Sequence, residues 1–188
     1  MLDLDVIEDP AAAAAALDPV RARLLAALAE PGSAATLAGR TGLSRQKINY
    51  HLRALEAHDL VRQVGDRRWG GLTERLFLAT AASYVISPDA LGEAASDPAR
   101  TSDRLSARYL IALAARIVRE VAALTRRAEQ QDKRLAVLAI DAEIRFRSAA
   151  DRAAFADELT AAVASLVSRY HDESGHWHRL LVAAHPRP

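Results

Sequence analysis

The chain has 188 residues, a length that fits one or two small domains. Hydrophobic residues make up 51% of it but aromatic residues only 5%, so its apolar share is largely alanine and favours closely packed helices over a large aromatic core. The net charge is +1, which excludes the strongly basic composition of proteins that coat nucleic acids but leaves room for a local basic face.

Three absences narrow the class further. The chain has no cysteine, which excludes disulfides and thiolate metal sites and fits a reducing compartment. Its acidic start, MLDLDVIEDP, does not have the composition of a signal peptide, and no apolar run is long enough to cross a bilayer. We therefore expect a cytoplasmic protein that does not bind membranes.

The first 16 residues are acidic and then rich in alanine, with Pro10 between the two parts. We interpret 1–16 as a flexible tail, although alanine favours helix and the segment could become ordered against a partner. The next stretch contains three short predicted helices. The pair Asp18-Pro19 marks the start of the first, Pro31-Gly32 its end, and 34–40 the second. After the glycine turn "TGLS", Ser44 caps a third helix that runs to about residue 58, which gives helix-turn-helix geometry.

A β-hairpin is expected directly after the third helix. Leu60, Val61 and Val64 predict a short strand, "GDRRWGG" over 65–71 predicts a turn, and a β-rich stretch follows over 72–86. Trp69 is expected to anchor the base of the hairpin. A hairpin after a helix-turn-helix unit is the layout of a winged helix, so we predict a winged helix-turn-helix domain over 17–99, ending in the looser segment 87–103.

The second half, 100–188, is predicted to contain a helix, a strand, a helix and a strand. The helix over 101–131 has two adjacent apolar stripes, which predicts burial from two directions, one of them against a second copy of the chain. Apolar and charged residues alternate over 140–147, 148–170 is helical, and "HWHRLLVAAH" over 176–185 predicts a last strand. The fold class is therefore α+β, with a winged helix-turn-helix domain followed by a long dimerisation helix and a small helix-strand-helix-strand unit.

Taken in order, the pieces of the first half resemble an ArsR-type winged-helix regulator. The resemblance is carried by "ALDPVRARLLAALA" over 16–29 and "LAGRTGLSRQKINYHLRALEAHDLVRQVGDRRW" over 37–69. It implies transcription regulation through DNA binding. Two departures limit it: the chain has no cysteine for metal sensing, and its second half is longer than the short dimerisation helix of the family.

The polar residues of the third helix have the chemistry of base recognition. Arginine reads guanine, and glutamine and asparagine read adenine, in the major groove, which admits one α-helix. An ordinary solvated face is the alternative interpretation, but no acid occurs in this helix before Glu56. The hairpin arginines would contact phosphates or the minor groove. His51 is equally compatible with a structural role and with a contact. The expected DNA-binding residues are Ser44, Arg45, Gln46, Lys47, Asn49, Tyr50, Arg53, Arg67 and Arg68.

The second half offers weaker candidates for a sensor. Aromatic and cationic side chains could line a pocket for a small-molecule effector, and the residues we name are Tyr109, Arg116, Phe146 and Trp177. Four histidines occur after residue 170, but their spacing is not that of a metal site, so no metal or other cofactor is expected. The sequence contains no catalytic motif, such as G-x-S-x-G, a P-loop or H-E-x-x-H, and we expect no enzyme.

These observations predict a dimeric regulator, with repression the expected mode, that binds a near-palindromic operator in double-stranded DNA through the helix from Ser44 and the 65–71 wing. The alternative is a winged-helix module that binds another protein without sequence-specific DNA binding. Such a module should present apolar or acidic residues on the third helix, where this chain has Arg45, Gln46, Lys47 and Asn49.

Overall fold

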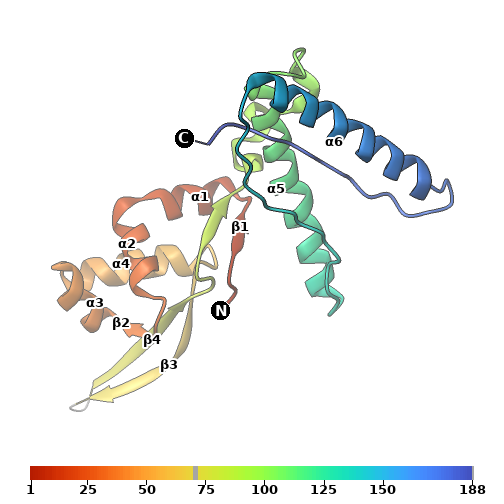
Figure 1. The fold of residues 1–188 in the computed structure, drawn as a ribbon. Coiled ribbons are helices and arrows are strands. Elements are labelled where there is room, and N and C mark those ends of the chain that lie inside the picture. The colour runs from red at the N-terminus through yellow and green to blue at the C-terminus, as the bar shows by residue number, and fades with distance from the viewer. Residues whose placement is uncertain (70–71, 188) are drawn as a thin grey trace. The chain divides into compact units, whose positions relative to one another are not determined.

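The computed structural model describes residues 1–69 and 72–187, and the chain divides into two compact units, 1–135 and 136–188 (Figure 1). The first unit contains helices and two small sheets, and one long helix dominates the second, so the α+β class is confirmed. Among the described residues, no helix has both the length and the apolar character needed to cross a bilayer.

Three short helices follow one another as the sequence predicts. They are α2 (Pro19–Ala27), α3 (Ala34–Thr41) and α4 (Arg45–Glu56). Asp18 caps α2 by accepting hydrogen bonds from the amides of Val20 and Arg21, and Gly42 ends α3 in the left-handed region at φ 73°. The three helices enclose a core of fully buried aliphatic side chains: Leu24, Leu28, Leu37, Ile48, Leu52 and Leu55.

The β-hairpin after α4 belongs to a three-stranded antiparallel sheet. Its strands are β2 (Gly32–Ser33), β3 (Val61–Trp69) and β4 (Leu72–Ala79), in the order β2-β4-β3. The register shifts between Gln63 and Gly65, which is the mark of a β-bulge and bends the hairpin. Gly70, Gly71 and the side chain of Trp69 lie outside the described residues, so the expected anchoring role of Trp69 stays a prediction.

The first 16 residues are not the flexible tail that we expected. Strand β1 (Asp5–Ile7) pairs in parallel with β5 (Tyr84–Ile86), and α1 (Pro10–Leu17) follows it. Ile7 joins the core, and three alanines of α1 are buried beside it: Ala12, Ala13 and Ala15. The physical reason is that alanine side chains are short enough to let α1 pack closely, so a low-complexity run can still be core.

Helix α5 (Ala107–Gln130) belongs to the first unit, so the chain does not divide near residue 99 as predicted. Two 3₁₀ segments, η1 (Pro88–Ala94) and η2 (Pro98–Arg100), lead into it. Arginines along α5 form ion pairs with acids of the preceding segments: Arg116 with Asp97, Arg119 with Asp89 and Arg126 with Glu8. These pairs, together with the packing of α5 against η1 and η2, associate the helix with the N-terminal unit.

The second unit contains α6 (Ala149–Tyr170), capped by Ser148, as expected. The predicted strands over 140–147 and 176–185 are not formed in the single chain, because no described residue of 136–187 takes part in a β-ladder. A strand needs a hydrogen-bonding neighbour, and neither segment has one here. Every described residue of this unit is exposed or half-buried, so the unit has no closed core of its own.

The placement of Ile7 in the core can be tested by truncation. Ile7→Ala should lower the free energy of unfolding by about 2–4 kcal/mol, because Ile7 is only 5% exposed and the lost side chain leaves a cavity. Leu4→Ala, at a residue that is 53% exposed, should change it by less than about 0.5 kcal/mol. Urea unfolding measures both values, and equal small effects would mean that the N-terminal segment is not part of the core.

Candidate nucleic-acid interface

Helix α4 separates its side chains into a buried stripe and an exposed polar face. Ile48, Leu52 and Leu55 are inside, at the i, i+4, i+7 spacing of one helix face. The structure brings the predicted α4 residues together on the other face, and all of them are exposed: Ser44, Arg45, Gln46, Lys47, Asn49, Tyr50 and Arg53. Their side chains are therefore available to a partner.

The N-terminal turn of α4 is electropositive. The Ser44 hydroxyl accepts a hydrogen bond from the Lys47 amide at 3.3 Å, and the first turn contains no acidic residue. The left-handed Gly42 lets the chain reverse between α3 and α4 so that this end of α4 can start beside α3. A helix N-terminus already favours anions, and Arg45 and Lys47 add full charges to it.

The hairpin adds arginines beside that end of α4. Arg67 and Arg68 are both exposed on β3, and the Arg67 guanidinium forms an ion pair with Glu74 at 2.9 Å. The pKa of the Glu74 carboxyl is lowered. The largest cause is a hydrogen bond from the Ser33 hydroxyl, the next is Arg67, and Arg45 contributes to the same shift. The Glu74 carboxylate therefore interacts electrostatically with Arg45 of α4 and with Arg67 of the hairpin, so the predicted residues of α4 and of the hairpin lie near each other.

Arg75 on β4, which sequence reasoning missed, links the hairpin to α4. Its Nε donates to the Gln63 carboxamide oxygen at 2.6 Å, and its Nη2 donates to Glu56 at 2.8 Å. The guanidinium also lies 4.8 Å from the centre of the Phe77 ring. These contacts orient the hairpin relative to the C-terminal end of α4. No local pattern could reveal them, because Arg75 and Glu56 are 19 positions apart.

The remaining cations of the face are not neutralised by the protein. Within 1–69 and 72–187, Arg45, Lys47, Arg53 and Arg68 form no ion pair. Arg67 differs from them, since Glu74 already holds it. The face is thus a set of amide, hydroxyl and guanidinium donors whose cations, Arg67 excepted, form no ion pair within these ranges.

His51 is part of the core side of α4 and not of the exposed face. It is only 6% exposed, and neither ring nitrogen has a hydrogen-bond partner among the residues that the structure describes. Burial lowers its pKa, and the positive charges of Arg21 and Lys47 act in the same direction, while Asp18 opposes them. Of the two roles that the sequence left open for His51, a structural one and a contact with a partner, its burial favours the structural one.

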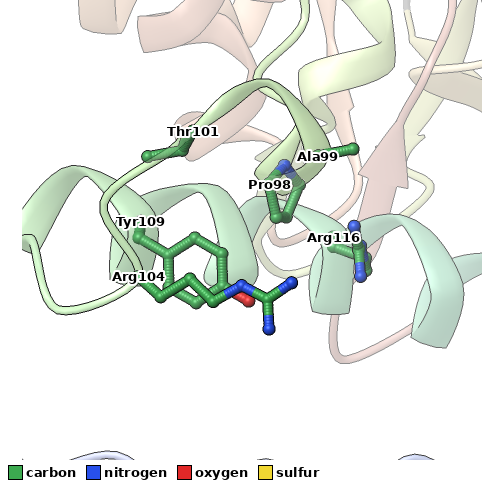
Figure 2. Close-up of a pocket in the computed structure, with 6 residues that line it drawn as sticks. All are labelled: Pro98, Ala99, Thr101, Arg104, Tyr109 and Arg116. Atoms are coloured by element: carbon green, nitrogen blue, oxygen red, sulfur yellow. The ribbon is translucent and has the colours of Figure 1, made fainter.

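The predicted effector residues are divided between the two units. Tyr109 and Arg116 line a surface hollow of about 240 Å³ with Arg104, and Figure 2 shows them facing Pro98, Ala99 and Thr101. Phe146 and Trp177 belong to the second unit and do not line this hollow. Phe146 instead packs against Phe155 at 5.3 Å, and Trp177 is 93% exposed near His171. Among the described residues, no three histidine or acidic side chains are gathered in a way that could hold a metal ion.

The fold of α2, α3 and α4, the exposed face and the adjacent hairpin can now be compared with known proteins. Residues 16–64 match the model of a helix-turn-helix domain family. The match begins at the end of α1 and extends into β3, so it includes the whole of α4. A search of curated proteins finds no match to this chain.

The helix-turn-helix match supports a general function in DNA binding and regulation. Families of this kind are DNA-binding regulatory domains and are not typically enzymatic, so the expected helix-turn-helix regulator is confirmed at that level. The finer prediction, an ArsR-type protein with a winged arrangement, is not tested by this match.

The buried histidine of the helix-turn-helix domain should make stability depend on pH. Because the pKa of His51 is lowered in the native state, the unfolded chain takes up its proton first as the pH falls below about 6.5, and the free energy of unfolding then decreases. His51→Leu should remove the part of the decrease in the free energy of unfolding between pH 7 and 5 that comes from this histidine. Urea titrations at several pH values measure it, with the exposed His185→Leu as the matched control. A pH dependence that His51→Leu leaves intact would contradict the assignment.

Proposed function

We propose that the protein is an ArsR-type winged-helix transcriptional regulator that binds a near-palindromic operator as a homodimer and acts chiefly as a repressor. The observation that carries the proposal is the exposed row of donors on α4, whose cations Arg45, Lys47 and Arg53 have no ion-pair partner within the described residues. Because no internal ion pair of these three residues has to be broken, they can contact the phosphates that line a DNA groove directly.

In this proposal α4 lies in the major groove, which is about 12 Å wide. Arg45 has the geometry to bind guanine, and Gln46 and Asn49 can each pair with adenine through both polar atoms of the side-chain amide. The capped N-terminus at Ser44 suits a phosphate, and Tyr50 suits a phosphate or a thymine methyl group. Arg53 and Lys47 would contribute mainly to backbone contacts.

The hairpin β3–β4 would be the wing. Arg68 is exposed and has no ion pair within the described chain, so it is the wing residue best able to meet a phosphate or the adjacent minor groove. Arg67 would first have to exchange Glu74 for DNA. Because exposed ion pairs are weak, the strong field of the phosphates makes that exchange feasible.

A dimer gives this small interface enough contacts. Symmetric operators place two half-sites about one helical turn apart, and a two-fold dimer presents two α4 helices to them. Helix α5 supports the dimer because apolar residues on it remain exposed, with Ile111 at 65% and Leu124 at 45%. Leaving such side chains in water is unfavourable, and a second α5 would cover them.

The hollow beside α5 supports a small-molecule effector as part of the proposal. Arg104 and Arg116 contribute positive charge to it, Tyr109 contributes a ring and a hydroxyl, and Arg116 is shared with Asp97 at 3.6 Å. Its volume is below that of sites for drug-sized ligands, so a small anion such as a carboxylate fits it best. An effector could change DNA binding only through different affinities for the two states of the protein.

Substitutions on α4 separate base recognition from general attraction. On a duplex selected from a random pool, Asn49→Ala should weaken binding by about 1–3 kcal/mol and relax the preference at one base position. Lys47→Ala should weaken binding to all duplexes and reduce the salt dependence by about one phosphate contact. Fluorescence anisotropy at several salt concentrations measures both, with the exposed α6 residue Arg152→Ala as control.

The same titration distinguishes the protein-binding alternative. A module of that class would show no salt-dependent binding to any duplex at low ionic strength, and Asn49→Ala would then have no effect to measure.

Glu74 should restrain DNA binding. Glu74→Gln removes the negative charge that pairs with Arg67 and lies near Arg45, so binding to random duplex should become tighter and its salt dependence steeper by about one contact. Glu30→Gln makes the same change of net charge at an exposed residue outside α4 and the β3–β4 hairpin and is the matched control. An equal increase in both variants would show that only net charge matters.

A further inference from the structure

The segment 141–147, DAEIRFR, has an apolar side that the second unit already uses. Phe146 packs against Phe155 of α6, with ring centres 5.3 Å apart, and Ala142 and Ile144 share its side of an extended chain. Ile144 is still 55% exposed. The segment therefore contacts α6 through Phe146, and its backbone takes part in no β-ladder within the described residues, so it can accept a neighbouring strand.

The charged side of the segment is ordered by sign. Asp141 and Glu143 precede Ile144, and Arg145 and Arg147 follow it. When two such segments run antiparallel and cross at Ile144, position i faces position 288 − i of the other copy. Opposite charges then meet at every charged position. Asp141 faces Arg147 and Glu143 faces Arg145, and the two-fold axis repeats each of these two contacts.

Other registers do not give this match. A parallel pair places each charge opposite its own copy. An antiparallel register shifted by one residue places the apolar residues of one strand opposite the charged residues of the other. A shift of two residues places Glu143 opposite Glu143, or Arg145 opposite Arg145, at the crossing point, and like charges directly opposite are unfavourable.

The ion pairs that the described residues form with these charges are loose. Glu143 contacts Arg187, and both side chains are more than three-quarters exposed. Arg147 lies 3.6 Å from Asp151, and its side chain is 95% exposed. Exposed pairs of this kind are weak and easily exchanged, so they leave the segment available to a better-matched partner.

We infer that residues 141–147 pair antiparallel with the same residues of a second copy of this chain, with the two-fold axis at Ile144. The occupant is identified by charge complementarity, since the segment is complementary to itself. The inference deepens the proposed homodimer and rests on it. It adds a two-stranded sheet, built from two copies, to the contact proposed for α5, and it explains why 140–147 alternates without forming a ladder in one chain.

The absence of native cysteines allows a direct test by cross-linking in the full chain. A residue on the two-fold axis faces itself, so Ile144→Cys should form an interchain disulfide under mild oxidation, because directly opposite residues have a suitable separation. Ala142→Cys is the matched control: it would lie about 13 Å from its copy and should not cross-link. The double variant Ala142→Cys with Phe146→Cys should cross-link again. Non-reducing electrophoresis reads out all three.

Charge reversal supplies a second readout. Glu143→Arg places arginines opposite each other twice and should weaken the dimer about tenfold, as measured by sedimentation velocity. Adding Arg145→Glu exchanges the two signs and should restore the dimer to within about threefold. Recovery in the double variant excludes misfolding as the cause.

The outcomes also separate this inference from the proposed function. A dimeric, DNA-binding protein in which Ile144→Cys cross-links no better than Ala142→Cys would overturn the strand pairing and leave the regulator intact. A monomeric protein that still binds DNA would overturn both the strand pairing and the homodimer. Selective cross-linking with charge-swap recovery supports the pairing, whether or not DNA binding is later observed.

Discussion

Burial of one side of α4 is the constraint on which the rest of the structure depends. Ile48, Leu52 and Leu55 are almost completely removed from water, in the same core as Leu24 and Leu37. Removing this much aliphatic surface from water dominates over any preference of the polar side chains. Since the helix cannot rotate without exposing that stripe, its donors are held outward without having to be positioned by hydrogen bonds of their own. The shape of the candidate interface is thus a consequence of core packing.

The hairpin is oriented by a second, polar set of contacts. Arg75 joins Gln63 and Glu56, while Glu74 joins Ser33 and Arg67, so two adjacent residues of β4 serve opposite faces of the strand. One contact fixes the hairpin to the C-terminal end of α4, and the other keeps an acid among the cations near its N-terminal end. Glu74 would therefore compete with a DNA phosphate for these cations. The net affinity for DNA would reflect the difference between the attraction of the cations to phosphate and their attraction to Glu74.

The sequence correctly predicted the elements that depend on neighbouring residues. It did not predict the elements whose structure depends on residues far away in the chain. Helices α2, α3 and α4 follow from caps such as Asp18 and Ser44 and from apolar spacing, so their limits were close to correct. Residues 1–16 were mistaken for a tail because alanine gives no periodic signal, and only the pairing of β1 with β5 shows their place. The polar face of α4 could be read from the sequence, whereas the Arg75 contacts and the burial of His51 required tertiary structure.

A net charge of +1 is compatible with DNA binding because the charges are segregated. On α5, Arg116, Arg119 and Arg126 are matched with acids of the preceding segments, so these three side chains add little to the external field. On α4 there is no acid in the first turn and no ion pair at Arg45 or Lys47 among the described residues. Within about a Debye length of a surface, the local arrangement matters more than the total. An almost neutral chain can therefore present one cationic face and avoid the general attraction to nucleic acids that a strongly basic protein would have.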